Sequence, residues 1–231
     1  MDGVIYFSCT GNGEKVANLL AEKIKFPLFE LTNRSYEKIL NDVYGTAVIV
    51  FPVHCQSFPK FLNRLFKKIK AENVALIATY GKINAGNALY EAAKRVRANI
   101  VAAAYLPAGH SYLRAGVDEI NIPAELTDKI LNPTPVTVPR RKKTPFAGVL
   151  PNFRSRVILK IYASGKCAGC NLCGDICPYN AIIRGKTNNR CTRCLKCVAS
   201  CPHGALSFKK YRILSRYLDK HRADETILYV K

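Results

Sequence analysis

The sequence predicts an α/β protein in which a doubly wound parallel sheet is followed by a small cysteine-rich α+β domain. Two observations lead to this fold class. The N-terminal half alternates continuous apolar runs with helical patterns, and eight of the ten cysteines lie in the C-terminal half in a repeated spacing. A length of 231 residues allows one large or two modest domains, and an apolar fraction of 48% suffices for buried cores.

The parallel sheet is predicted from short apolar runs, each followed by apolar residues at helical spacing. Continuous apolar strands that alternate with amphipathic helices are typical of a parallel sheet covered on both faces. The predicted strands are 4–7, 47–51, 74–79 and 100–105, with 29–31 as a short edge strand. The predicted helices cover 14–24, 58–69 and 89–96.

A ligand site is expected beyond the carboxyl ends of these strands, at the topological switch point of the sheet. The loop Ser8–Gly13 brings hydroxyls and flexible glycine backbone to the start of a helix. Free N–H groups and the helix dipole favour a phosphate monoester there, with an ordinary tight turn as the alternative. The loop matches neither the nucleoside-triphosphate motif nor the dinucleotide glycine motif. The loops 52–58, 79–86 and 107–112 are expected nearby.

The run Ile5-Tyr6-Phe7-Ser8-Cys9-Thr10-Gly11-Asn12-Gly13 resembles the FMN phosphate loop of flavodoxins, which typically reads Thr/Ser-x-Thr-Gly-Asn-Thr. Gly13 departs from that pattern, so one hydroxyl donor is lost while a backbone N–H remains. The resemblance covers about residues 3–123 and implies a flavodoxin-like domain that binds FMN. The cofactor-binding residues expected from it are Ser8, Cys9, Thr10, Gly11, Asn12, Gly13, Pro52, Val53, His54, Thr79, Tyr80 and Gly81.

Three side chains are candidates for catalysis, by proton delivery or substrate contact: His54, Tyr80 and His110. Tyr80 is also predicted to flank the flavin ring, with a surface tyrosine at a strand end as the alternative. For His54 a packed polar role is an equal alternative. Cys9 is expected to fill the loop as a small side chain, because no histidine partner for a nucleophile is evident.

The C-terminal half contains an internal duplication. Cys167-x-x-Cys170-x-x-Cys173-x-x-x-Cys177-Pro178 returns 24 residues later as Cys191-x-x-Cys194-x-x-Cys197-x-x-x-Cys201-Pro202. Three cysteines in a tight turn can wrap one cluster, and the fourth, placed before proline, serves the other cluster. The pattern therefore predicts two [4Fe-4S] clusters. Cluster I is assigned to Cys167, Cys170, Cys173 and Cys201, and cluster II to Cys191, Cys194, Cys197 and Cys177.

Zinc and disulfides are the alternatives for these cysteines. Zinc sites commonly use separated Cys-x-x-Cys pairs, and disulfides suit secreted chains, so neither explains the two runs as well. The two runs resemble bacterial two-cluster ferredoxins over about residues 160–208.

Four segments are expected along the chain. They are a flavodoxin-like FMN-binding domain over 1–123, a proline-rich basic linker over 124–159, a two-[4Fe-4S] ferredoxin domain over 160–208, and an extension over 209–231 that could dock on the first domain. The stretch between Ser111 and Pro123 has a poor helical pattern. The last helix of the first domain is therefore either missing or supplied from beyond the linker.

The combination of cofactors indicates electron transfer. FMN exchanges electrons singly or in pairs and each cluster passes one at a time, so a chain with both connects one-electron and two-electron chemistry. The whole chain resembles fused flavodoxin–ferredoxin proteins, a group found mainly in anaerobes. The expected function is an iron–sulfur flavoprotein oxidoreductase that acts on a small substrate or a redox partner. The alternatives are a pure electron carrier and a redox-sensing nucleic-acid-binding protein.

The formal net charge of +20 is concentrated in the second half, where residues 124–231 carry 21 basic and 6 acidic side chains. Bound clusters and phosphate would offset part of this charge, and the rest could steer an acidic redox protein or a small-molecule electron acceptor. Nucleic acid ranks lower because no helix-turn-helix or aromatic RNA-binding motif is present. The oligomeric state stays open, a homodimer included.

The sequence predicts a cytoplasmic protein. No apolar run reaches the roughly 18 to 20 residues of a membrane-spanning helix. The first residues, Met1-Asp2-Gly3, lack the basic region of a signal peptide.

Overall fold

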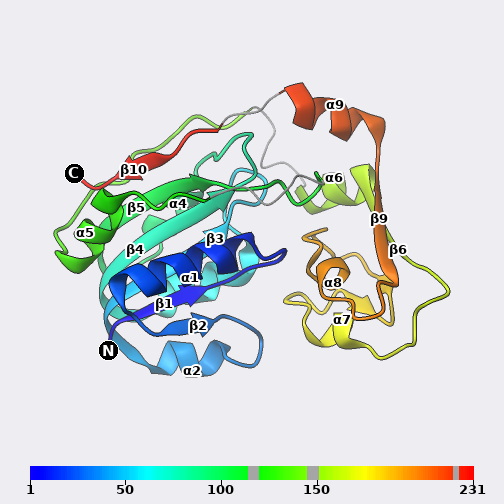
Figure 1. Cartoon of the computed structure of the whole chain (residues 1–231), viewed down its shortest axis with the longest axis horizontal. Coiled ribbons are helices and arrows are strands. Elements are labelled where there is room, and N and C mark those ends of the chain that lie inside the picture. The colour runs from blue at the N-terminus through cyan, green and yellow to red at the C-terminus, as the bar shows by residue number, and fades with distance from the viewer. Residues whose placement is uncertain (114–119, 145–150, 221–223) are drawn as a thin grey trace. The chain divides into compact units, whose positions relative to one another are not determined.

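The computed structural model describes residues 1–113, 120–144, 151–220 and 224–231 (Figure 1). The chain divides into two compact units. Unit 1 consists of Met1–Ala147 and Ala223–Lys231, and unit 2 consists of Gly148–Arg222. Within the described residues, no helix combines the length and the apolar character needed to cross a membrane.

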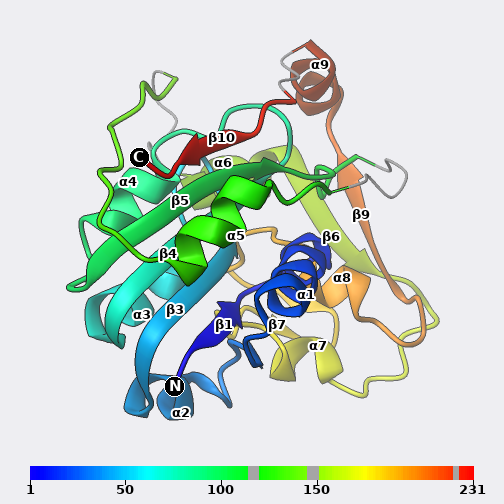
Figure 2. The same ribbon diagram turned by 60° about the vertical axis from the view of Figure 1, so that its left-hand side comes forward.

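Unit 1 is built on a six-stranded sheet with the order β10-β5-β4-β3-β1-β2 (Figure 2). The strands are β1 (Gly3–Tyr6), β2 (Leu28–Glu30), β3 (Val43–Pro52), β4 (Lys70–Tyr80), β5 (Asn99–Pro107) and β10 (Ile227–Tyr229). β1 to β5 pair in parallel, and β10 pairs antiparallel with β5. Without β10 this is the strand order of the flavodoxin-like doubly wound fold, so the predicted fold class is confirmed.

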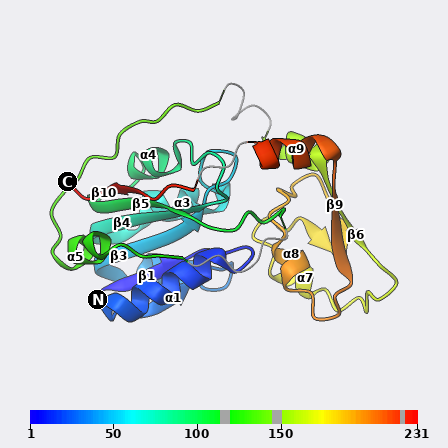
Figure 3. The ribbon, with the colours of Figure 1, turned by 45° about the horizontal axis from the view of Figure 1, so that its top comes forward.

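Helices cover both faces of this sheet (Figure 3). One face carries α1 (Asn12–Ile24) and α5 (Ala124–Leu131). The other face carries α2 (Tyr36–Asn41), the 3₁₀ turn η1 (Lys60–Leu62), α3 (Asn63–Lys68) and α4 (Ala88–Ala93). The central strands are buried on both sides, which explains why residues 47–51 are all apolar. Among the helices of unit 1, α2 and α5 lie where the sequence analysis predicts no helix.

The segment predicted as a linker, 124–159, differs from that expectation. Leu126 and Ile130 of α5 are buried against the sheet, so α5 supplies the last helix of the doubly wound domain. The chain beyond α5 is extended, yet it packs on unit 1. The N–H of Val136 donates to the carbonyl of Ile100 at 2.7 Å, and Val138 is buried. The proline spacing correctly indicates extended backbone, but exposed and packed extended chains have the same pattern. Residues 145–150 lie outside the described residues.

Unit 2 begins earlier than the sequence predicts, because α6 (Pro151–Ile158) and the first residue of β6 belong to it. β6 (Leu159–Ala163) pairs antiparallel with β9 (Leu206–Lys210), and Ile161 lies opposite Phe208. Between these strands lie α7 (Leu172–Asp175), the hairpin β7 (Ile182–Ile183) and β8 (Lys186–Thr187), and α8 (Lys196–Ala199). The helix α9 (Arg212–Lys220) follows.

The internal duplication is repeated in the backbone of unit 2. The short helices α7 and α8 start and end 24 residues apart. Three pairs of residues with the same separation share left-handed backbone angles. They are Gly169 and Arg193 (φ 69° and 61°), Asn171 and Leu195 (58° and 64°), and Asn180 and Gly204 (48° and 56°). Because four of these six residues are not glycine, the turn geometry is imposed by the fold and not by residue preference.

The C-terminal segment is attached to unit 1 through Tyr80. The Tyr80 hydroxyl donates to the carbonyl of Glu225 at 2.6 Å and accepts from the N–H of Glu225 at 2.9 Å. Its ring is buried and meets Tyr105 edge-on at 6.4 Å. These contacts do not support the predicted place of Tyr80 beside a flavin ring, because both the ring and the hydroxyl are used in fixing the last strand.

We expect Tyr80→Phe to loosen this segment without unfolding unit 1. The substitution removes two hydrogen bonds to the Glu225 backbone and keeps the ring, so a loss of roughly 1 to 2 kcal/mol in unfolding free energy is expected. Amide exchange in residues 224–229 should become faster, as measured by hydrogen–deuterium exchange. Tyr162→Phe, on an exposed tyrosine, is the matched control. Unchanged exchange in Tyr80→Phe would contradict the assigned role.

Candidate functional site

The eight cysteines of the duplication line two separate cavities in unit 2. One cavity is lined by Cys167, Cys170, Cys173 and Cys201, and it is called cavity I here. The other is lined by Cys177, Cys191, Cys194 and Cys197, and it is called cavity II. These are the two sets predicted from the spacing, with the fourth cysteine of each run in the other run's cavity. Four thiols around one cavity are the donor set of a cubane cluster.

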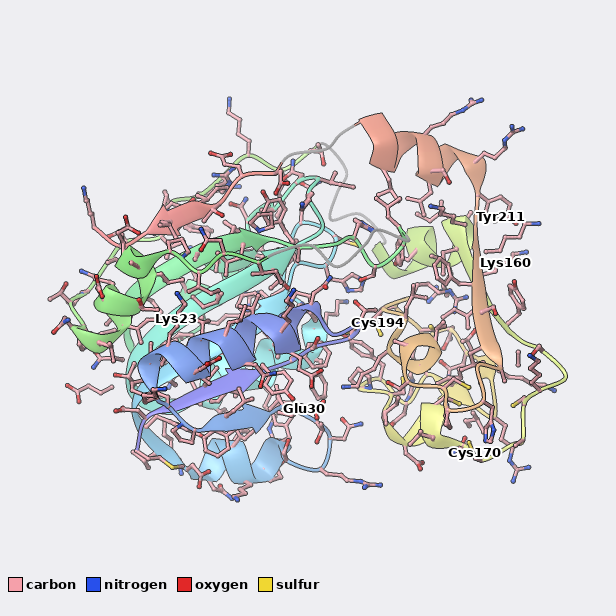
Figure 4. The ribbon with its side chains drawn as sticks, viewed as in Figure 1. Lys23, Glu30, Lys160, Cys170, Cys194 and Tyr211 are labelled. Atoms are coloured by element: carbon pink, nitrogen blue, oxygen red, sulfur yellow. The ribbon has the colours of Figure 1, made fainter. Side chains whose placement is uncertain are left out.

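The two cavities differ in their exposure. Cys167 and Cys170 are exposed, whereas Cys191 and Cys197 are buried (Figure 4 labels Cys170 and Cys194). The turn that begins with Cys191 is tied to β6, because Arg193 reaches back and its Nε donates to the carbonyl of Leu159 at 3.0 Å. The corresponding turn of cavity I has Gly169 at the equivalent position and no side chain to make this bond.

The pKa values of the thiols differ between the two cavities. Burial raises the pKa of Cys197 to about 12 and also raises the pKa of Cys177. Backbone N–H groups, that of Ala205 first, lower the pKa of Cys201. The same hydrogen bond occurs in both halves, since Ala181 donates to Cys177 Sγ at 3.3 Å and Ala205 to Cys201 Sγ at 3.4 Å. Metal loading of cavity II must therefore displace protons from its thiols.

In unit 1, the predicted phosphate loop lies at the N-terminus of α1. Gly11 is the N-cap residue with φ 91°, and no side chain caps the helix. The first-turn N–H groups therefore have no side-chain acceptor at this cap, which suits an anion. Ser8 is buried at the base of the loop, and Cys9 packs against the core, as expected for a loop filler.

Gly13 is explained by close packing. A Cβ at this position would lie 3.2 Å from the carbonyl oxygen of Phe7 and 3.5 Å from Ser8 Cβ. The helix start thus sits tightly on the end of β1, and a threonine would force the two apart. The departure from the flavodoxin pattern has a local steric reason.

The loop after β5 is tied to the phosphate loop. Asn12 Nδ2 donates to the carbonyl of Gly109 at 2.6 Å, and the hydroxyls of Thr10 and Ser111 lie 3.0 Å apart. His110 packs against Gly81 so closely that a Cβ on Gly81 would overlap its ring. The structure therefore brings together Thr10, Asn12, Gly81 and His110 from loops of three strands.

His110 has a defined hydrogen bond on one side of its ring. The N–H of Tyr112 donates to Nδ1 at 3.1 Å, so in the neutral ring the proton is on Nε2. The Tyr112 ring lies 5.1 Å from that of His110. Together these contacts orient an imidazole N–H donor at the sheet edge where ligands bind in such folds.

The remaining predicted residues lie at the ends of β3 and β4. Thr79 is buried and lies opposite Pro52 in the sheet. The N–H of Val53 donates to the carbonyl of Thr79 at 2.7 Å. His54 forms a tight turn with Ser57, with backbone hydrogen bonds of 2.7 and 3.1 Å between them. His54 thus belongs to a turn separate from the Thr10–His110 cluster.

Two amide side chains that the sequence analysis missed hold the chain beyond α5. Asn87 Nδ2 donates to the carbonyl of Arg141 at 2.6 Å, and the Arg141 N–H donates to Asn87 Oδ1 at 2.5 Å. Gln56 also makes two hydrogen bonds to one residue: the Thr144 N–H donates to Oε1 at 2.9 Å, and Nε2 donates to the Thr144 hydroxyl. An isolated Asn or Gln in a loop has no sequence signal for such pairing, because its partner is about 50 to 90 residues away.

Asn87 and Arg141, which form the first of these clamps, also line a basic groove of about 680 Å³ beside α4. Its acidic residue, Glu91, is paired with Lys143 and also accepts from the Ser57 hydroxyl. The groove thus presents excess positive charge on a fixed backbone, and the run 140–143 is not a free linker. The lining residues are Asn87, Tyr90, Glu91, Lys94, Arg140, Arg141, Lys142 and Lys143.

Two segments of unit 2 match family models for 4Fe-4S binding domains, one over residues 164–180 and one over residues 186–207. Each match contains one of the four-cysteine runs. No curated protein matched the chain. Among solved structures, a candidate flavoprotein from Bacteroides uniformis is similar at 19% identity and a TM-score of 0.35, covering 47% of this chain and 91% of that one. A second candidate flavoprotein, from Bacteroides eggerthii, is similar at 17% identity and a TM-score of 0.32, covering 43% and 84%.

Double substitutions test the exchange of the fourth cysteine between the two cavities. Cys170→Ser with Cys201→Ser removes two ligands from cavity I, so we expect iron to fall from about eight to about four per chain. Cys170→Ser with Cys177→Ser affects one ligand in each cavity and should abolish most iron binding. Both pairs remove two thiols, so each is the control for the other. Iron and sulfide analysis of anaerobically purified protein measures the cluster content of both variants. More iron in the Cys170→Ser, Cys177→Ser protein than in the Cys170→Ser, Cys201→Ser protein would overturn the assignment.

Proposed function

We propose that this chain is an electron-transfer flavo-iron–sulfur protein that passes single electrons through two [4Fe-4S] clusters to or from FMN. The observation that carries this proposal is the convergence of four cysteines, drawn from both runs, on each of two cavities. The matches to 4Fe-4S binding domains support the iron–sulfur part. When bound, the clusters supply one-electron transfer, and FMN accepts electrons singly or in pairs.

The residues fit a flavin phosphate at α1. The uncapped helix start offers N–H groups to an anion, and Gly11 has open space where a side chain would otherwise stand. The hydroxyls of Ser8 and Thr10 supply further donors. His110, oriented by Tyr112, would present its Nε2 proton to a bound ligand. These residues bind and orient; Tyr80 is excluded from the flavin set because it is buried against Tyr105 and Glu225.

An oxidoreductase with its own substrate is favoured over a pure carrier by the environment of His110. An imidazole N–H donor fixed beside the loops that follow β1, β4 and β5 can donate a hydrogen bond to a substrate, a contact that a carrier does not need. The candidate catalytic residue that this argument supports is therefore His110, whereas His54 lies on a separate turn with Ser57.

Flavin binding is tested by comparing FMN with riboflavin, which lacks the phosphate. We expect FMN to bind much more tightly, and Thr10→Val to weaken FMN about tenfold while leaving riboflavin unchanged, because one hydrogen bond to the phosphate is lost. Thr127→Val on α5 is the matched control, since its hydroxyl binds the Ala124 carbonyl at 2.7 Å. Fluorescence quenching of the flavin measures both constants. Equal affinity for the two flavins would overturn the phosphate site, and eight irons with no flavin would leave a ferredoxin-like carrier.

The proposed partner is an acidic redox protein that docks on the basic groove. Its cations are exposed at Arg140, Arg141 and Lys142, and exposed charges give steered, salt-dependent association of proteins. The two amide clamps fix the backbone that carries these cations, so less conformational entropy is lost when a partner binds. Because these cations are exposed, the surface suits a protein partner better than a small anion, whose binding would need hydrogen-bond donors shielded from water.

We expect Arg140→Glu with Lys142→Glu to weaken binding of a fluorescent oligoglutamate peptide on the order of tenfold or more at physiological ionic strength. Lys67→Glu with Lys68→Glu, on exposed positions of α3, changes the net charge equally and should have a small effect. Fluorescence anisotropy measures both. Equal losses would show a general charge effect, and tighter binding of an oligonucleotide of equal charge would favour a nucleic-acid partner instead.

A further inference from the structure

The hydroxyl of Thr192 has an unusual position in cavity II. Thr192 lies between the ligand candidates Cys191 and Cys194 and is one of the residues that line the cavity. It is 5% exposed, and its Oγ1 is buried with no hydrogen-bond partner among the described residues. A buried hydroxyl without a partner is destabilising, and a valine of nearly the same shape would avoid that cost.

The equivalent position in the other half lacks this group. The shift of 24 residues that relates the two runs places Ala168 opposite Thr192, and Ala168 is exposed. The residues that follow these two positions, Gly169 and Arg193, share a left-handed backbone angle, so the turn continues in the same way in both halves. The hydroxyl is therefore an addition to one half of a repeated frame and not a requirement of the turn.

We propose that Thr192 is a positioning residue that donates a hydrogen bond from Oγ1 to the sulfur atoms of the cluster in cavity II and so raises its reduction potential above the value that burial alone would give. Hydrogen bonds to cluster sulfurs stabilise the reduced, more negative form. The sulfur of an iron–sulfur cluster is the acceptor that this buried donor lacks among the residues that the structure describes. The two clusters then differ by a directed hydrogen bond as well as by exposure.

This inference rests on the iron–sulfur part of the proposed function and is independent of FMN. An EPR-monitored reductive titration with dithionite resolves one electron for each cluster. We expect Thr192→Val to move one of the two reduction steps to lower potential, with the iron content unchanged at about eight per chain. Thr192→Ser keeps the hydroxyl and should leave that step in place. Ala168→Val, at the equivalent position in the lining of cavity I, is the matched control and should leave the step that Thr192→Val moves in place.

Two cysteine variants show which reduction step belongs to the cluster in cavity II. Cys177→Ser should remove the step that Thr192→Val moves, and Cys201→Ser should leave that step. Full iron content with unchanged potentials in Thr192→Val would overturn this inference alone. A step that is removed by Cys201→Ser would also overturn it, because the hydroxyl would then act on the wrong cluster. Failure of the unmodified chain to bind iron would overturn the proposed function together with it.

Discussion

Each four-cysteine run in unit 2 gives three thiols to one cavity and its fourth thiol to the other, and the architecture of the unit depends on this exchange. Cys177 and Cys201 must reach across to the partner cavity, so neither half can complete a four-thiol site by itself. The strands β6 and β9, which precede and follow the two cysteine runs in the sequence, pair in an antiparallel manner. With a hydrophobic core as small as Ile182, Cys197 and Leu206 at its centre, the unit has few apolar contacts to hold it together, and metal ligation would add the missing stability.

Unit 1 has larger hydrophobic cores than unit 2, because its sheet buries one core on each face. The chain leaves this unit after Ala147 and returns to it at Ala223, so unit 2 is covalently connected to unit 1 at both ends. The returning segment adds β10 to the edge of β5 and is fixed by Tyr80. An edge strand that would otherwise present free N–H and C=O groups is thereby covered. The same principle explains the clamps of Asn87 and Gln56, whose side-chain amides satisfy backbone groups of an extended segment.

The sequence predicts the features that depend on local pattern. Continuous apolar runs identify β1, β3, β4 and β5, because strands buried on both faces need no polar residues, and the cysteine spacing identifies the two ligand sets that the cavities bring together. What depends on distant packing is not predictable in this way. Tyr80 at a strand end has the same local signature whether it faces a ligand or anchors Glu225. The helix α5 and the extended chain after it were expected as a linker, because proline and charge indicate extended backbone without indicating whether it packs.

The duplication of unit 2 separates what a fold requires from what a site adds. The paired left-handed residues, the paired short helices and the paired N–H to Sγ bonds at Ala181 and Ala205 recur in both halves, so they belong to the frame that shapes a four-thiol cavity. Gly169 against Arg193 is a difference within that frame, and the cysteines differ too, since Cys167 and Cys170 are exposed whereas Cys191 and Cys197 are buried. Since solvent exposure and hydrogen bonding set the potential of an iron–sulfur cluster, one repeated backbone can hold two clusters of different potential. A difference of that kind gives electron flow between two otherwise equivalent centres a direction.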